Sequence, residues 1–253
     1  MIEITRQGTI VEVCLRRHPV NAIDEDMLVR LREAVADIRQ NSDTTVLLLR
    51  GEGRVFCAGA DIRMLRDALE AGNSERMLQF TRAAQALKND IEALSCITIA
   101  AIHGAATGGG LELALACDFR VCGTDARLGL PEIKLGLLPA AGGTQRLTRL
   151  IGAGNASRMI LSGDLLSGAE AARIGLVQWA VTNGEVLEFA RSLAQQVMNH
   201  PKSAIAGGKR CIAAASGDRM AGFQTEVQCQ ETLLASPRTI ELLRAFLDHR
   251  KDS

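Results

Sequence analysis

Residues Ile102–Asp118 read IHGAATGGGLELALACD, and this stretch gives the strongest indication of the fold. The short apolar run Thr98–Ile102 is typical of a buried strand, and three consecutive glycines after it open an apolar helix. Free backbone N–H groups at a helix start can hold an anion or a developing oxyanion. Glycine removes the side chains that would block such a site. The stretch therefore predicts a strand, a glycine turn and a helix with an accessible N-terminus.

Glu112 lies in the first turn of this expected helix. One interpretation is that it complements the helix dipole, which is worth under about 1 kcal/mol. However, Leu111 and Leu113 flank it, and the segment is too apolar for a solvent-exposed face. Because a glutamate in such surroundings is costly unless it is partnered or functional, Glu112 is a candidate site residue.

Upstream, Val55–Ile62 reads VFCAGADI and offers Ala58, Gly59 and Ala60 in succession. Small residues let a ligand approach the backbone, and Gly59 permits a positive φ. A simple tight turn with small filler residues is the alternative. Cys57 has no adjacent histidine to activate it, so we expect a small apolar filler there.

Downstream, Leu128–Leu150 reads LGLPEIKLGLLPAAGGTQRLTRL. It begins as an apolar loop with one carboxylate, Glu132, directly after Pro131, and residues 141–144 open another helix. Taken alone, Glu132 is better explained as an exposed loop acid than as a site residue. Together, the three segments suggest two N–H donors and two carboxylates in apolar surroundings. That set suits proton transfer beside a carbonyl whose enolate is held by the donors.

The remaining segments predict an α/β fold followed by helices. Strands alternate with helices in the first part of the chain, which indicates crossover units. After residue 184 the pattern becomes helical throughout. We therefore expect an α/β domain at 1–190 and a helical region at 191–253. The expected strands are 2–5, 9–15, 45–49, 98–102 and 119–123, and the expected helices are 24–40, 73–94, 185–199, 202–215, 219–235 and 237–249.

The composition excludes several classes of function. The 253 residues carry 29 Lys+Arg against 29 Asp+Glu, which argues against an electrostatic nucleic-acid binder. The absence of tyrosine excludes phenolic catalysis. Seven cysteines without a C-x-x-C pair and four histidines without metal-ligand spacing favour a reduced protein without a metal site. The apolar runs are too short for a membrane span, and the N-terminus lacks a targeting pattern, so we expect a cytoplasmic protein.

The segments FCAGADI, HGAATGGGLELALACD and LPEIKLGLLPAAGGTQRL together resemble the enoyl-CoA hydratase/isomerase (crotonase) superfamily, in its order and spacing. The similarity covers nearly the whole chain. It implies a crotonase-like spiral of ββα turns and a C-terminal helical region that mediates trimerisation. It also implies an acyl-coenzyme A thioester as substrate, a homotrimer or a dimer of trimers, and no cofactor beyond the coenzyme A of the substrate.

The resemblance also assigns the catalytic groups. The oxyanion donors fall on the backbone N–H groups of Ala58 and Gly109, and the two hydratase glutamates fall on Glu112 and Glu132. Because both glutamates are present, the resemblance favours an enoyl-CoA hydratase of fatty-acid or related acyl-CoA degradation. Glu112 would act as base toward water, and Glu132 would deliver the proton to C2.

Contacts to the coenzyme A and acyl parts follow from the same resemblance. Ala60, Asp61 and Ile62 match the stretch that receives adenine, and Arg63 stands near the phosphates. Arg17 or His18 matches another phosphate-side position. Met64, at the start of a 64–80 segment, is expected in the acyl pocket, and Phe246 in the acyl or pantetheine channel. His249 stands where hydratases often have lysine.

Three other functions remain open from the sequence. The first two are a Δ3–Δ2 enoyl-CoA isomerase and a hydratase for a branched, methylglutaconyl-CoA-like substrate. The third is a non-catalytic or RNA-binding use of the scaffold, against which the balanced charge and the two glutamates argue.

Overall fold

The computed structural model describes residues 1–249. The chain divides into two compact units, Met1–Met198 and Asn199–Ser253. The division expected at residue 190 falls inside helix α7 (Val186–Val197), which belongs wholly to the first unit.

The first unit is built on a mostly parallel sheet. Within the described residues, six strands follow the order β1-β2-β3-β4-β6-β9. β1 and β2, expected as strands, form an antiparallel hairpin, and each later neighbour pairs in parallel. Short strands β5, β7 and β8 form a second sheet. The strands are β1 (Ile2–Gln7), β2 (Ile10–Leu15), β3 (Val46–Gly51), β4 (Ile97–Ile102), β5 (Ala106–Thr107), β6 (Phe119–Gly123), β7 (Arg127–Gly129), β8 (Leu166–Ser167) and β9 (Trp179–Val181).

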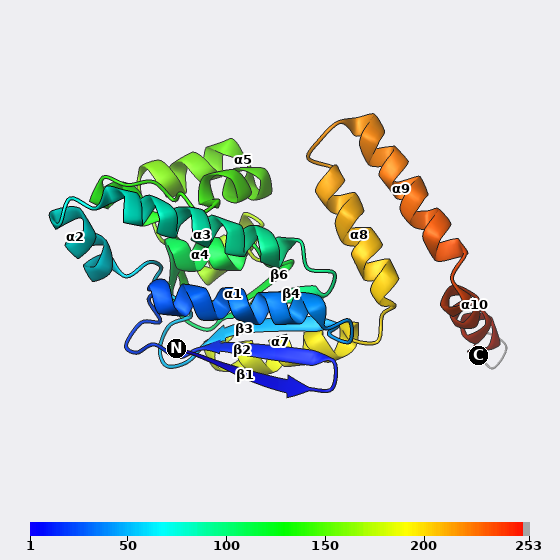
Figure 1. Ribbon diagram of the computed structural model, residues 1–253. Coiled ribbons are helices and arrows are strands. Elements are labelled where there is room, and N and C mark those ends of the chain that lie inside the picture. Colours follow the sequence, from blue (N-terminus) through cyan, green and yellow to red (C-terminus); the bar gives the residue numbers. More distant parts are fainter. Residues whose placement is uncertain (250–253) are drawn as a thin grey trace. The chain divides into compact units, whose positions relative to one another are not determined.

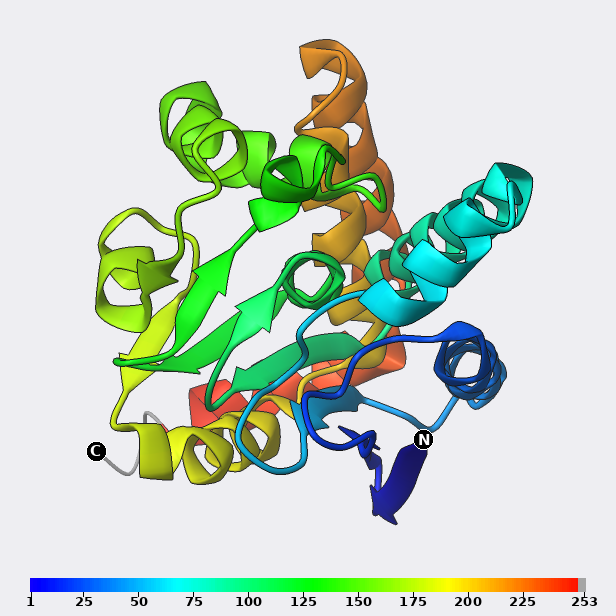
Figure 2. The same ribbon diagram turned by 90° about the vertical axis from the view of Figure 1, so that its left-hand side faces the viewer.

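Helices cover this sheet, as the α/β pattern predicts. α1 packs against α3, and α7 packs against β3, β4 and β6 (Figures 1 and 2). Asp24 caps α1 by accepting the N–H of Met27 at 2.9 Å. The helices of this unit are α1 (Glu25–Gln40), α2 (Ile62–Glu70), α3 (Ser74–Glu92), α4 (Gly109–Leu115), α5 (Gly143–Leu161), α6 (Gly168–Arg173) and α7, with 3₁₀ turns η1 (Pro131–Leu135) and η2 (Asn183–Glu185).

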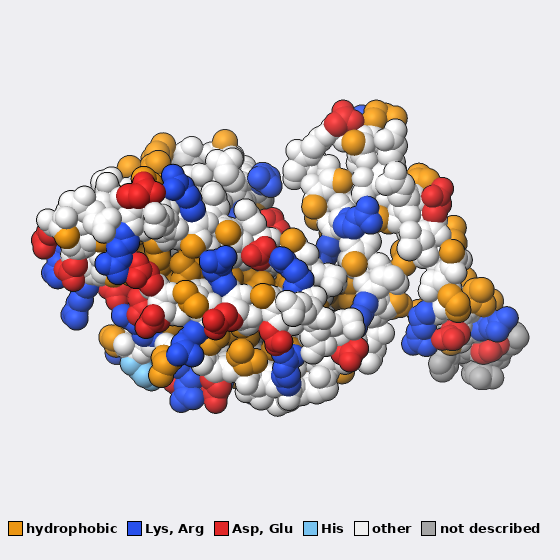
Figure 3. Space-filling view, viewed as in Figure 1, with side chains coloured by type: hydrophobic (Ala, Val, Ile, Leu, Met, Phe, Trp, Pro, Cys, Tyr) orange, Lys and Arg blue, Asp and Glu red, His pale blue; other side chains and the backbone are white. Residues whose placement is uncertain are grey.

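The second unit is helical, with α8 (Lys202–Ala214), α9 (Arg219–Leu234) and α10 (Pro237–His249). α8 and α9 pack on each other, and Cys229 of α9 is buried beneath Gly207, where a Cβ would lie 3.5 Å from the cysteine Cβ. Many large apolar side chains of this unit face outward, and several gather on α9 and α10 (Figure 3). None of the described helices is long and apolar enough to cross a membrane.

Candidate active site

The loop between β3 and α2 forms one wall of the site, and Asn21 holds it in place. Asn21 is buried, adopts a φ of 52°, and donates from its amide to the carbonyls of Glu52, Val55 and Phe56 at 2.9–3.2 Å. Its role in the loop follows from partners more than 30 residues away, which no local pattern reveals.

The structure corrects one of the two predicted oxyanion donors. The N–H of Ala58 donates to the carbonyl of Val20 at 3.0 Å, so it is not available to a ligand. The N–H of Ala60 has no acceptor among the described residues. Ala60 also lies beside Gly109, since a Cβ on Gly109 would be 3.4 Å from the Ala60 nitrogen. The available pair of donors is therefore Ala60 and Gly109.

Gly59 keeps this pair accessible. Its φ is +95°, and a Cβ there would lie 2.9 Å from the nitrogen of Gly109 and 2.8 Å from the carbonyl oxygen of Thr107. Gly109 begins α4, so its own N–H has no acceptor within the helix. Absence of a side chain at Gly59 thus leaves the start of α4 open, as the small-residue pattern predicted.

Glu112 lies in the first turn of α4 and is only 3% exposed. Its Oε1 accepts the N–H groups of Ala141 and Gly143, both at 2.8 Å. These donors belong to the turn that opens α5, so the glycine-rich segment near residue 142 orients this carboxylate. Glu112 is therefore partnered, which meets the expectation that a buried glutamate needs compensation.

A buried lysine, Lys88 of α3, completes the surroundings of Glu112. Its side chain is 2% exposed, and its Nζ lies 3.8 Å from Oε2 of Glu112. Lys88 was not among the predicted site residues. Its spacing could have revealed it, because position 88 falls on the apolar helix face that also carries Ala84, Leu87 and Ile91.

Glu132 lies in the 3₁₀ turn η1 and is oriented into the same region. Its Oε1 would be 3.1 Å from a Cβ on Gly108, next to the start of α4. Its Oε2 is buried and has no hydrogen-bond partner among the described residues. Burial, together with the negative charge of Glu112, raises the pKa of Glu132 to about 7. Glu132 is thus not the exposed loop acid that its position alone allowed.

The site can therefore move one proton beside an anion-stabilising hole. One carboxylate is held by two N–H groups near a cation, and the other has an unpartnered oxygen and a pKa close to neutrality. Such a difference between two acids is what general acid–base catalysis at neutral pH requires.

Asp61 and Arg63 have structural partners at the start of α2. The carboxylate of Asp61 caps this helix by accepting the N–H groups of Arg63 and Met64. It also pairs with Arg17 at 2.6 Å. The Arg63 side chain and Ile62 are exposed. The contacts with coenzyme A that the resemblance implies for residues at the start of α2 therefore stay predictions.

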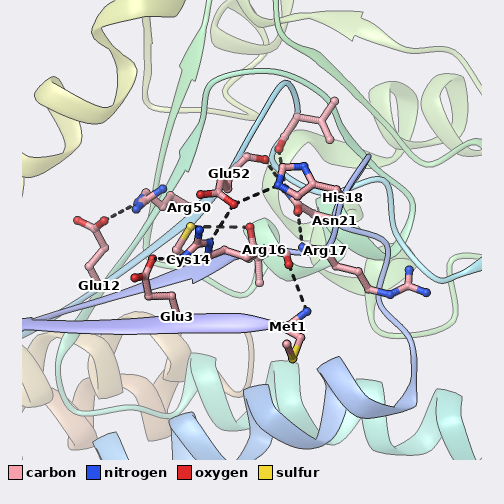
Figure 4. A network of polar contacts seen from close by, with 12 residues as sticks. Met1, Glu3, Glu12, Cys14, Arg16, Arg17, His18, Asn21, Arg50 and Glu52 are labelled. Carbon is pink, nitrogen blue, oxygen red and sulfur yellow. Dashed lines mark hydrogen bonds and ion pairs between the residues drawn. The ribbon is translucent and has the colours of Figure 1, made fainter.

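His18 lies on the surface beside Glu52, in the polar network of Figure 4. Its Nε2 is 3.3 Å from Oε2 of Glu52, which Arg16 also contacts at 2.9 Å. The His18 side chain is exposed, whereas Arg17 is tied to Asp24 and Asp61. Of the two alternatives for the phosphate-side position, His18 is the more accessible.

The other predicted residues are distributed over both units. Met64 is half-buried in α2, and Phe246 lies in α10 of the second unit with an exposed side chain. Cys57 is buried, which raises its thiol pKa to about 11, as expected of a filler residue. His103 pairs with the carbonyl of Gly53 at 3.0 Å. Among the described residues, no three His, Cys, Asp or Glu side chains are placed to share a metal.

Comparisons with known proteins find relatives over nearly the whole chain. The sequence model of the family described as "Enoyl-CoA hydratase/isomerase" matches residues 5–253. "Probable enoyl-CoA hydratase 2, mitochondrial" of Arabidopsis thaliana is 42% identical over 246 residues, covering 96% of this chain and 80% of that protein. "Enoyl-CoA isomerase/hydratase fer4" of Mycosarcoma maydis is 38% identical over 233 residues, covering 90% and 84%. The crystal structure of an enoyl-CoA hydratase from Bacillus anthracis is similar at a TM-score of 0.92 and 35% identity, covering 98% of this chain and 96% of that one.

Proposed function

Because this chain belongs to the enoyl-CoA hydratase/isomerase family, we propose that it is a hydratase that adds water to a trans-2-enoyl-CoA thioester. Family membership and the similar solved structures confirm the expected crotonase-type α/β fold. The observation that carries the hydratase proposal is the pair of glutamates at one buried site: Glu112 accepts two backbone N–H groups, whereas Glu132 has a buried oxygen without a partner among the described residues and a pKa raised to about 7.

The first step would be binding of the thioester carbonyl at Ala60 and Gly109. Their N–H groups would donate to its oxygen and would bind it more tightly as negative charge develops on the enolate. Each backbone donor of this kind is typically worth about 3–4 kcal/mol of barrier. A side-chain substitution does not delete these donors, so Gly59 is the position through which the hole can be tested.

The second step would be syn addition of water. The water oxygen forms a bond to C3 while Glu112 accepts a proton from that water. The C2–C3 double bond is lost, and C2 takes the proton carried by Glu132. The glutamate pair therefore starts and ends with one proton: Glu132 has given its own to C2, and Glu112 now carries one taken from the water. In the reverse direction Glu132 is the base, and Glu112 protonates the leaving hydroxyl.

The direct test is incubation with crotonyl-CoA. We expect the absorbance of the conjugated enoyl thioester to fall and the product mass to rise by one water. A set of enoyl-CoA thioesters of increasing chain length, together with a branched, carboxylated methylglutaconyl-CoA, would then define the acyl preference. Persistent absorbance with every thioester would overturn the proposal.

A second candidate is Δ3–Δ2 enoyl-CoA isomerisation, which the name of the relative from Mycosarcoma maydis favours. Glu132, which can both lose and regain a proton near pH 7, is suited to moving a proton along an acyl chain. A 3-enoyl-CoA substrate separates the two reactions, because isomerisation forms the conjugated thioester without a change of mass.

We also propose that the chain assembles into a homotrimer or a dimer of trimers. The support is the set of exposed apolar side chains on the helices of the second unit, among them Ile212, Phe223 and Leu243. Light scattering would measure the mass in solution. The reaction would need no cofactor besides the coenzyme A of its substrate. A cytoplasmic location stays a prediction, and the names of two relatives include the word mitochondrial.

A further inference from the structure

Lys88 is a buried cation for which the proposed reaction has no direct use. Its side chain is 2% exposed on the inner face of α3. Its Nζ donates to the carbonyl of Ala84, one turn earlier, at 3.4 Å, and lies 3.8 Å from Oε2 of Glu112. A buried ammonium group is costly, and an apolar side chain of similar volume would fill this position without that cost.

Four titratable groups act on Lys88, and they come from α4, η1, α5 and the loop between β3 and α2. Glu112 of α4 and Glu132 of η1 favour its charged form, as does the thiol of Cys57, whereas burial and Arg146 of α5 disfavour it. Burial dominates and lowers the pKa of Lys88.

Two of these neighbours are already neutralised or uncharged. Arg146 donates to Glu92 at 2.7 Å and to Asn89 at 2.7 Å, so its charge has its own partner. The Cys57 thiol, with its pKa raised to about 11, is neutral near pH 7. The ammonium group of Lys88 is therefore left to act on the glutamates, and Glu112 is the glutamate in ion-pair contact with it.

We propose that Lys88 is a positioning residue that keeps Glu112 ionised and thereby holds the single proton of the glutamate pair on Glu132. This inference rests on the proposed hydratase function, since it explains which glutamate starts as base and which as acid. Oε1 of Glu112 is held by two N–H groups, and Lys88 supplies the countercharge near Oε2.

The direction in which removal of Lys88 should move the pH–rate profile can be worked out. A nearby positive charge favours ionised carboxylates, so its loss makes the glutamate pair bind protons more tightly. Activity requires one proton on the pair. The acid limb of the pH–rate profile reports uptake of a second proton, and the alkaline limb reports loss of the only one. Both limbs should move to higher pH without Lys88, and the acid limb should move more because Glu112 is the contacting residue.

The test compares Lys88→Met, Lys88→Gln and Lys88→Arg, using crotonyl-CoA across the pH range. For Lys88→Met and Lys88→Gln we expect kcat to fall by about tenfold, KM to stay within about twofold, and the acid limb to move up by about one pH unit or more. Lys88→Arg should restore the position of the profile. Arg82→Met is the matched control, because Arg82 is an exposed cation of the same helix. A profile that keeps its position in Lys88→Met and Lys88→Gln would overturn the proposal.

A second measurement needs no turnover and so separates this proposal from the hydratase assignment. Infrared difference spectra between Glu132→Gln and the Glu112→Gln/Glu132→Gln double variant isolate the carboxyl group of Glu112. At pH 6 we expect the difference spectrum to show the band of an ionised carboxylate. When Lys88→Met is added to both variants, we expect this band to disappear. A carboxylate band that persists without Lys88 contradicts the inference. Failure to hydrate any thioester, with this spectral change present, would count against the hydratase proposal alone.

Discussion

Glu112 and Glu132 carry the same side chain in opposite surroundings. Glu112 lies on a helix, accepts two backbone N–H groups and faces a lysine. Glu132 lies in a 3₁₀ turn, and its buried Oε2 has no partner in the described part of the chain. The first carboxyl thus has hydrogen-bond donors and a lysine around it, whereas burial raises the pKa of the second.

The difference shows how a fold assigns roles to identical groups. A carboxylate with hydrogen-bond donors around it can serve as a general base. A carboxyl group with a pKa near 7 can both give and take a proton. The assignment comes from the surroundings of each group: Lys88 and two N–H groups lie around Glu112, whereas burial and the charge of Glu112 raise the pKa of Glu132.

Substitution of either glutamate is the strongest test of this comparison. We expect Glu112→Gln and Glu132→Gln each to lower kcat by roughly 10³-fold, because each removes one partner in proton transfer. Steady-state hydration of crotonyl-CoA measures the loss, and circular dichroism checks that the fold is retained. Full activity in either variant would show that the roles are wrongly assigned.

The pH dependence should identify Glu132 as the carrier of the proton. The free enzyme needs one proton on the pair, so kcat/KM should fall by about tenfold per pH unit above pH 7, as Glu132 ionises. Hydration consumes no net proton, so dehydration of the 3-hydroxyacyl-CoA must show the same profile. In Glu132→Gln the residual activity should lose this alkaline limb; a limb that stays would belong to another group.

Gly143 offers a milder way to disturb Glu112 alone. A Cβ at this position would lie 2.8 Å from Oε1 of Glu112 and 2.9 Å from the Cβ of Pro139. We expect Gly143→Ala to displace the carboxylate and lower kcat by about tenfold, since small misplacements of a catalytic group are costly. Gly154→Ala is the control on the same helix, because nothing lies within 4 Å of its Cβ. Equal activities of the two variants would contradict the role of the Gly143 contact.

Much of the fold could be predicted from periodicity and helix-breaking residues. The strands expected at 2–5, 9–15 and 119–123 and the helix expected at 24–40 are where the sequence placed them, to within two residues. The short elements α2, α6, β5, β7 and β8 were not predicted. Runs of two to nine residues carry too little periodicity, and they form because tertiary contacts stabilise them.

The site was predicted in part for the same reason. The glycine triplet and the apolar neighbours of Glu112 pointed to the start of α4, and Gly59 pointed to a close approach of the backbone. The donor at Ala58 was wrong because the carbonyl of Val20 takes its N–H. The sequence does not distinguish successive N–H groups of a loop, because they differ only in whether the fold places an acceptor next to each of them.

Local sequence patterns specify three features of this protein. They are two carboxylates in apolar segments, glycines at the starts of α4 and α5, and the helices of the second unit. These features are local, because helix periodicity, caps and glycine turns act within a few residues. Tertiary packing alone leaves the N–H of Ala60 available, sets Lys88 opposite Glu112 and buries an oxygen of Glu132 without a partner among the described residues. Each depends on groups 20 or more residues away in sequence, which only the packed fold brings within a few ångströms.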